Sequence, residues 1–187
     1  LNAGIGYGGS CFPKDTKALH WLANFNDYEL KTVKAAIETN DNQKFKIIKK
    51  ARKYYENLQG KKIAVLGLTF KPGTDDLREA PSLVNIPIFI DEGCEIKAWD
   101  PAGVENYKKK YPTEIIYCDS IDEAIKDADL CVIFTEWDEV KKYDITKFEK
   151  LMRNPIVIDG RNCYDLEQIK KTNVIYDSIG RKTVNVI

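Results

Sequence analysis

The residues of this chain that could do chemistry gather at its N-terminus, in the run Gly4-Ile5-Gly6-Tyr7-Gly8-Gly9-Ser10-Cys11-Phe12-Pro13-Lys14-Asp15. Four glycines in six positions disfavour a helix interior or a strand, because each glycine gives up maximal backbone entropy on folding. They are typical of a loop whose bare N–H groups approach a ligand. Pro13 and Asp15 are residue types favoured at a helix start, so we expect Cys11 to lie near a helix N-terminus.

A cysteine in this position is a candidate nucleophile. The helix N-terminus and the neighbouring Lys14 both favour the thiolate, which is the nucleophilic form. Asp15, four residues further on, could orient a water molecule or accept a proton. The alternative is a cysteine that only packs in a glycine-rich turn.

The run closely resembles the catalytic loop of the nucleotide-sugar dehydrogenases, in their UDP-glucose 6-dehydrogenase branch. The resemblance continues in three motifs that keep the family's order: residues 70–82 (FKPGTDDLREAPS), Thr135-Glu136-Trp137, and residues 159–162 (DGRN). Four motifs in the same order argue against a chance match. Members of this family begin with an NAD-binding Rossmann domain, and nothing in the sequence precedes the cysteine run. The resemblance therefore implies the C-terminal half of such an enzyme.

The implied reaction is the oxidation of the sugar C6 alcohol of a UDP-sugar to a carboxylate, with NAD as the cofactor. By the resemblance, Cys11 forms a thiohemiacetal and then a thioester, and Asp15 positions the water that hydrolyses it. Arg78 and Lys14 match positions that reach the cofactor, which the missing domain mainly binds. The family's general-base lysine, its asparagine and its glutamate lie upstream, so we expect the isolated chain not to turn over.

The resemblance also assigns the substrate-binding residues. Tyr7 and Gly8 match positions of the loop that touch the sugar nucleotide. Phe70, Lys71 and Arg161 match positions that bind its UDP part. Reasoning from the residues alone agrees in part, because Lys71 and Arg161 follow predicted strands and cations suit a diphosphate. Each of these cations on its own is more often a solvated surface charge.

Several alternatives remain open at this point. The chain could be a sugar-nucleotide-binding and dimerisation module without chemistry, or an unrelated cysteine acyltransferase or thioesterase. The last class needs a base near the thiol, and the only histidine, His20, lies nine residues after Cys11 in a predicted helix. Among nucleotide-sugar dehydrogenases, the cysteine run resembles the UDP-glucose branch more than the UDP-N-acetylmannosamine branch. The GDP-mannose enzymes are separated mainly by Thr135–Trp137, for which the sequence suggests a structural role.

Composition excludes several classes of protein. The 187 residues include 29 basic and 29 acidic side chains, so no overall field favours nucleic acid or an anionic membrane. The longest apolar runs, residues 63–66 and 130–134, are too short to span a bilayer. Five cysteines without a CxxC pair argue against a disulfide framework and for a reducing, cytoplasmic setting. A single histidine leaves no metal-ligand spacing, so no metal site is expected.

Residues 1–60 are predicted to form the cysteine loop and a helical dimerisation segment. One helix is expected over Asp15–Phe25, with Trp21 off its apolar stripe. Tyr28–Leu58 contains no glycine or proline and predicts a long helix of roughly 45 Å. Its broad apolar stripe would be a sticky patch if exposed. The stripe could pack on the chain's own core, or it could form a homodimer interface, which the family resemblance supports and which we expect.

Residues 61–187 are predicted to form a Rossmann-like domain that binds the UDP-sugar. Strands are expected over residues 63–66, 94–99, 115–117, 130–134, 156–159 and 174–176, and helices over 82–92, 102–110, 120–127, 145–152 and 166–171. This alternation predicts an α/β fold with a doubly wound parallel sheet, whose ligands bind beyond the carboxyl ends of the strands. Gly67–Lys71 does not match GxGxxG, and the acidic residue closing the next strand comes 33 positions after Gly67 rather than about 20. We therefore expect the domain to lack a dinucleotide site.

Overall fold

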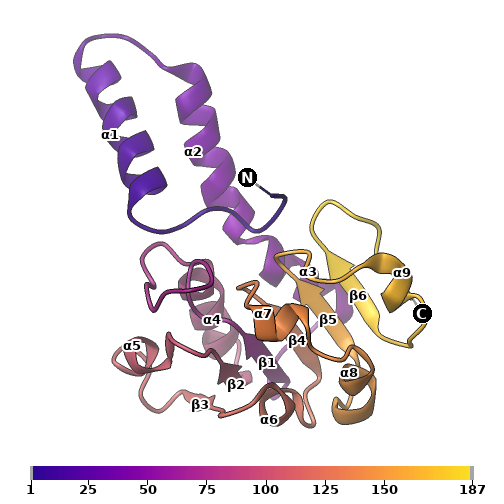
Figure 1. The fold of residues 1–187 in the computed structure, drawn as a ribbon. Coiled ribbons are helices and arrows are strands. Elements are labelled where there is room, and N and C mark those ends of the chain that lie inside the picture. Colours follow the sequence, from indigo (N-terminus) through magenta and orange to yellow (C-terminus); the bar gives the residue numbers. More distant parts are fainter. Residues whose placement is uncertain (1, 186–187) are drawn as a thin grey trace.

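The computed structural model describes residues 2–185 of the chain. A helical hairpin projects from a sheet domain, and the N-terminal loop runs across the base of the hairpin (Figure 1). The helices of this region are α1 (Cys11–Phe25), α2 (Lys31–Lys44) and α3 (Lys46–Tyr54). The expectation that Cys11 lies at a helix start is confirmed, because Cys11 is the first residue of α1 and Ser10 is its N-cap.

The long helical stretch expected over Tyr28–Leu58 is present over Lys31–Tyr54, with one interruption at Phe45. There the Phe45 N–H donates to the Asn42 carbonyl at 3.3 Å instead of continuing the regular ladder. The two parts have different environments. Ile47, Ile48 and Ala51 of α3 are buried against the sheet, whereas the apolar side chains of α2 are only half-buried beside α1. The helix is interrupted at Phe45, so that the apolar face of α3 packs on the sheet while that of α2 packs beside α1.

The predicted α/β class is confirmed. Six parallel strands lie in the order β3-β2-β1-β4-β5-β6, the doubly wound order of Rossmann folds. The strands are β1 (Lys62–Leu66), β2 (Glu95–Trp99), β3 (Ile115–Tyr117), β4 (Leu130–Ile133), β5 (Ile156–Asp159) and β6 (Ile175–Ser178). The helices between them are α4 (Ser82–Asp91), α5 (Val104–Lys108), α6 (Ile121–Ile125), α7 (Asp138–Lys141), α8 (Thr146–Leu151) and α9 (Leu166–Ile169).

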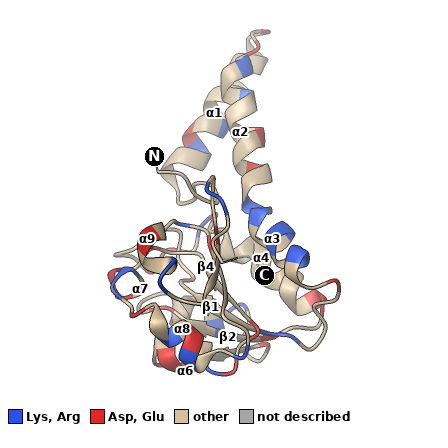
Figure 2. Cartoon of the chain, turned by 90° about the vertical axis from the view of Figure 1, so that its right-hand side faces the viewer, with Lys and Arg blue, Asp and Glu red and all other residues tan. Residues whose placement is uncertain are grey.

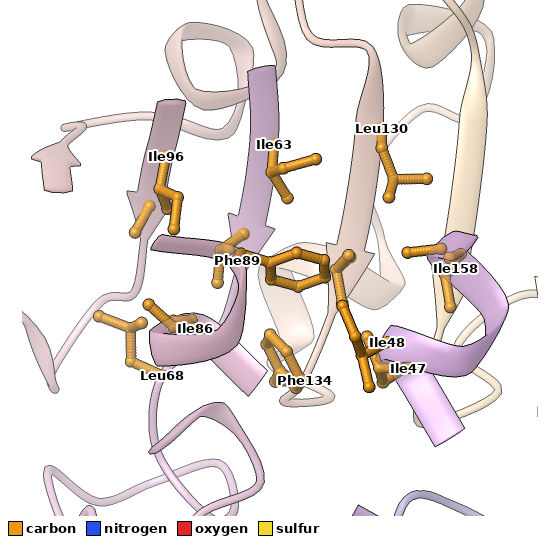
Figure 3. Close-up of a cluster of buried hydrophobic side chains, with 14 of the residues drawn as sticks. Ile47, Ile48, Ile63, Leu68, Ile86, Phe89, Ile96, Leu130, Phe134 and Ile158 are labelled. Atoms are coloured by element: carbon orange, nitrogen blue, oxygen red, sulfur yellow. The ribbon is translucent and has the colours of Figure 1, made fainter. Parts of the chain in front are cut away.

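The core lies on both faces of this sheet, because successive side chains of a strand point to opposite sides. In β1, Ile63 and Val65 belong to one buried cluster, while Ala64 and Leu66 belong to the other. Figure 3 shows α3 and α4 packing on the first face, where Ile48 and Phe89 approach the strand residues. Helices α6 to α9 supply the second face, with side chains such as Phe148.

Charge is distributed without a dominant sign. Lys and Arg are interspersed with Asp and Glu over the chain, and the clearest local run of one sign is the basic run of α3 (Figure 2). Within residues 2–185, no helix combines the length and the apolar character needed to cross a bilayer.

Candidate functional site

The cysteine loop, defined here as residues 4–10, is fixed by close backbone approaches. Its Ile5 side chain is fully buried, the Ile5 N–H donates to the Gly160 carbonyl at 3.1 Å, and the Gly9 N–H donates to the Arg78 carbonyl at 2.8 Å. A Cβ on Gly8 would lie 2.5 Å from the carbonyl oxygen of Glu79, so no side chain fits there. The absence of side chains at the glycines therefore allows the loop backbone to lie in direct contact with the backbone of the sheet domain.

Cys11 follows this loop in the first turn of α1 and is exposed. The other four cysteines are unpaired and half-buried or buried. Burial raises the pKa of Cys94 to about 12 and of Cys118 to about 11, and it also raises the pKa values of Cys131 and Cys163. A thiol with a pKa of 11 is ionised in only about one molecule in a thousand at pH 8. Mild alkylation should therefore label Cys11 selectively.

Arg161 connects the three segments that surround the site. Its side chain is largely buried, and its guanidinium donates to the carbonyls of Phe134 (2.8 Å), Gly6 (3.1 Å) and Phe70 (3.3 Å). The carboxylate of Glu136 lies 3.3 Å from Arg161 Nε. Burial lowers the pKa of Arg161, and the negative charge of Glu136 opposes that shift. The cation is thus fixed by the protein before any ligand binds.

The turn that carries Arg161 is held by hydrogen bonds to the carboxylate of Asp159. Asp159 Oδ1 accepts the Arg161 N–H at 2.7 Å, and Asp159 Oδ2 accepts the Cys163 N–H and the Tyr176 hydroxyl, each at 2.6 Å. Burial raises the pKa of Asp159, while these hydrogen bonds favour its carboxylate form. Asp159 closes β5 and holds the backbone of this turn, and its negative charge also favours the protonated form of Arg161.

A cavity of about 1070 Å³ opens between the cysteine loop, α2 and the carboxyl ends of the strands. Its volume is at the upper end of the range for ligand pockets, roughly 300–1,000 Å³. The sequence-predicted residues that line it are Tyr7, Gly8, Cys11, Phe70, Lys71 and Arg161. Lys71 Nζ lies 5.3 Å from the centre of the Phe70 ring, so an aromatic face and a cation are adjacent there. The candidate thiol and the candidate nucleotide-binding side chains thus share one cavity.

Three other predicted site residues lie outside the cavity lining. Asp15 and Lys14 are exposed and face each other, with Lys14 Nζ 3.4 Å from Asp15 Oδ1. Arg78 is also exposed, and its guanidinium binds Asp76, which does line the cavity. Hydrogen bonds from Arg78 lower the pKa of that carboxyl. The structure therefore does not bring Lys14, Asp15 and Arg78 into the cavity lining that contains Cys11.

The Thr135-Glu136-Trp137 motif supports the loop after β1, as its expected structural role requires. The Thr135 hydroxyl donates to the Thr69 carbonyl, and Trp137 Nε1 donates to Asp100 Oδ2 at 3.0 Å. Asp100 also accepts the Leu68 N–H at 2.6 Å and the Gly103 N–H at 2.6 Å. This buried network fixes the segment that presents Phe70 and Lys71.

Sequence reasoning missed several residues of the site. Glu136 lines the cavity beside Arg161, and Asn40 and Gln43 line it from α2. Glu136 belongs to the Thr135–Trp137 motif, for which the sequence suggested a structural role, and Asn40 and Gln43 were assigned no role from the sequence. The signal available for Glu136 was its place directly after a buried strand; nothing local identified the α2 residues.

Comparison with known proteins agrees with this geometry. The profile of the UDP-glucose/GDP-mannose dehydrogenase family, UDP binding domain, matches residues 64–166, and the profile of the same family's central domain matches residues 1–42. The chain is 42% identical over 184 residues to UDP-glucose 6-dehydrogenase YwqF of Bacillus subtilis, covering 98% of this chain and 42% of that protein. It is 42% identical to TuaD of the same organism, covering 98% of this chain and 40% of that protein.

Solved structures give the same picture. A UDP-glucose dehydrogenase from Pyrobaculum islandicum superposes with a TM-score of 0.80 at 26% identity, over 93% of this chain and 38% of that one. A UDP-D-ManNAc dehydrogenase from Pyrococcus horikoshii has a TM-score of 0.76 at 29% identity, over 98% of this chain and 40% of that one. The chain spans about two-fifths of the length of the curated relatives it matches.

Proposed function

Because the chain belongs to the UDP-glucose/GDP-mannose dehydrogenase family, we propose that it is the substrate-binding and cysteine-carrying part of a UDP-glucose 6-dehydrogenase. One observation carries the proposal: Cys11 lines the same cavity as Phe70, Lys71 and Arg161. A nucleotide sugar is long enough to occupy both ends of such a cavity. Its diphosphate would take the cationic end and its sugar the end at Tyr7, Gly8 and Cys11.

The chemistry of this part of the enzyme would centre on Cys11. Oxidation of the C6 alcohol gives an aldehyde, and addition of the Cys11 thiolate to its carbonyl carbon gives a thiohemiacetal. That adduct keeps a hydride on carbon, so a second two-electron oxidation is possible and leaves a thioester. Water then attacks the thioester carbonyl, the C–S bond breaks, and the carboxylate and the free thiol result. Asp15, which is near Cys11 on the first turns of α1, is our candidate to position that water.

The residues of this chain suit only the edge of a cofactor site. The position after β1, where a dinucleotide fold would place a phosphate, is filled: a Cβ on Gly67 would lie 2.4 Å from Thr135 Cβ. Exposed Lys14 and Arg78 beside Cys11 are the cations that would contact NAD⁺ bound outside this domain. When bound there, NAD⁺ would accept the two electrons of each oxidation. The isolated chain is therefore proposed to bind substrate without turning it over.

Two alternatives concern the identity of the nucleotide-sugar substrate and the role of the isolated chain. The Pyrococcus horikoshii structure, at 29% identity, is of a UDP-D-ManNAc dehydrogenase, so a UDP-N-acetylmannosamine substrate is the nearest competitor, with GDP-mannose as another. The curated relatives at 42% identity favour UDP-glucose. As an isolated chain, the protein could also serve only as a sugar-nucleotide-binding module. Five unpaired cysteines support a reducing, cytoplasmic setting for any of these roles.

A calorimetric titration of this chain tests the proposal. UDP should bind with one site per chain, and NAD⁺ should neither bind nor compete. The reason is that the cavity offers aromatic side chains beside a fixed cation, while Thr135 fills the dinucleotide position. NAD⁺ binding as tightly as UDP would show that the missing GxGxxG pattern has misled us.

We also propose that the chain forms a homodimer through the α1–α2 hairpin. The sequence predicts the interface on Tyr28–Leu58, but Ile47, Ile48 and Ala51 of that stretch are buried against the sheet. We therefore assign the interface to exposed apolar side chains of α1 and of the turn that follows it. These side chains are Leu19, Trp21, Leu22, Phe25 and Tyr28. Trp21 and Phe25 stack with their ring centres 5.3 Å apart and remain 64% and 72% exposed. A surface of this kind favours association.

Sedimentation equilibrium at micromolar concentration should give the dimer mass. Leu22→Glu should give a monomer, because it places a charge in the centre of the apolar face. Ile116→Glu, at an exposed apolar residue on β3 away from the hairpin, is the matched control and should remain dimeric. If the wild-type chain sediments as a monomer, the proposed homodimer is wrong.

A further inference from the structure

The cysteine loop takes hydrogen bonds from two different parts of the fold. Backbone N–H and C=O groups need partners, and a glycine-rich loop cannot supply them from regular structure of its own. The sheet domain supplies the Gly160 and Arg78 carbonyls and the Arg161 side chain. The other partners are side chains of α2, more than thirty residues away in sequence. The loop is thus fixed between the domain that presents the cations and the helix that packs against α1.

The α2 partners are two side-chain amides on successive turns. Asn40 Oδ1 accepts the Tyr7 N–H at 2.7 Å, and Asn40 Nδ2 donates to the Tyr7 carbonyl at 3.1 Å. Gln43 Nε2 donates to the Gly4 carbonyl at 2.8 Å. Asn40 therefore binds both backbone groups of one loop residue, as a neighbouring strand would.

The residue type at position 40 is explained by this contact and not by the helix. Asparagine is a poor former of helix interiors, because its amide competes for backbone hydrogen bonds. Asn40 is only 7% exposed, and a buried amide is costly unless its polar atoms find partners. Gly6 makes room for it, since a Cβ there would lie 2.8 Å from Asn40 Oδ1.

We propose that Asn40 is a positioning residue, which sets where Cys11 lies relative to the bound nucleotide sugar by fixing Tyr7. Only three residues lie between Tyr7 and Cys11, and the far end of that segment is fixed because α1 packs on α2. The cations and the aromatic ring of the UDP end belong to the sheet domain, and the Asn40–Tyr7 contact reaches them through the Gly6 carbonyl that Arg161 binds. The inference rests on the proposed function, since it concerns the sugar end of the same cavity.

Asn40→Asp tests the proposal with little change of shape. The carboxylate can still accept the Tyr7 N–H but would face the Tyr7 carbonyl without a donor. Because Asn40 lines the cavity and the new carboxylate repels a diphosphate, the affinity for UDP should fall, but UDP and UDP-glucose should still bind at saturating concentration. The protection that saturating UDP-glucose gives Cys11 against iodoacetamide should fall from at least tenfold to less than threefold. Asn42→Asp, the same change at an exposed position of the same helix, should keep both values.

UDP binding and the protection of Cys11 together separate a positioning role from a purely structural one. A purely structural role of Asn40 would lower both UDP affinity and helix content. Asn40→Ala provides a second variant and should show the same split. Full protection of Cys11 in both variants would overturn the proposal. So would loss of UDP binding together with helical circular dichroism in both, because Asn40 would then serve the fold. If the wild-type chain itself binds no UDP, the proposed function fails and this inference fails with it.

Discussion

Replacing Cys11 by alanine in the full-length enzyme should lower the rate of UDP-glucuronate formation by roughly a thousandfold or more, the scale of losing a covalent nucleophile. Substrate binding should survive, because the cations and the aromatic ring of the cavity come from the sheet domain. The first oxidation needs a base and a hydride acceptor but no thiol. The step that fails is the adduct that retains the aldehyde for the second oxidation.

Variants at and near Cys11 should fail at different steps. Cys11→Ser offers a hydroxyl that is far less acidic than a thiol, so formation or breakdown of the adduct should stall. Asp15→Asn should slow the water step and let a thioester accumulate, which mass spectrometry of the Cys11 peptide would detect. Cys94→Ala, at a half-buried cysteine outside the cavity lining, is the control and should keep the wild-type rate. If the Cys11→Ala enzyme forms the carboxylate at near wild-type rate, the Cys11 thiol has no catalytic role and is only a packing residue.

Replacing Arg161 by alanine should weaken UDP binding to this chain by about 1.5–3 kcal/mol, or roughly 10- to 150-fold, the usual value of a charged hydrogen bond. The guanidinium lines the cavity and is oriented in advance by three backbone carbonyls and Glu136. A cation fixed in this way loses little conformational freedom when a diphosphate binds. Isothermal titration calorimetry measures the change.

Arg161→Lys separates charge from geometry. Lysine keeps the positive charge but loses the planar fork, so the affinity for UDP should fall to a value between wild type and Arg161→Ala. Arg153→Ala removes an exposed arginine that pairs with Asp129 away from the cavity, and UDP affinity should stay within twofold. Unchanged affinity in Arg161→Ala, with the fold intact by circular dichroism, would refute the assigned diphosphate site.

The sheet domain was largely predictable from sequence because most of its strands, such as β1, β3, β4 and β5, are short and nearly continuous apolar runs. Residues 115–117 and 156–159 match β3 and β5 at both ends. The division of the long helix at Phe45 was not predictable, since no glycine or proline marks it and its cause is the different surroundings of α2 and α3. The short helix α7 was not predicted, whereas α9, which has the same length, was.

The residues of the site could be predicted only where the residue type and its position in the sequence together suggest a role. A cysteine after glycines and cations after strands could be recognised, and the structure brings Cys11 and Arg161 to one cavity. The burial of Arg161 could not be foreseen, because it depends on carbonyls of Gly6, Phe70 and Phe134, which are far apart in sequence. The contact of Asn40 with Tyr7 joins residues 33 positions apart, and no local pattern encodes such a pair.

We propose that the thiol and the nucleotide-binding side chains serve one ligand, and the rate of Cys11 alkylation tests this most directly. The measurement uses this chain with iodoacetamide at pH 8, where Cys11 is the exposed thiol and the pKa values of the other four cysteines are raised by burial. We predict that saturating UDP-glucose slows alkylation at least tenfold, with half-protection at the dissociation constant found by calorimetry. An alkylation rate that stays unchanged while calorimetry shows UDP-glucose bound would contradict the account.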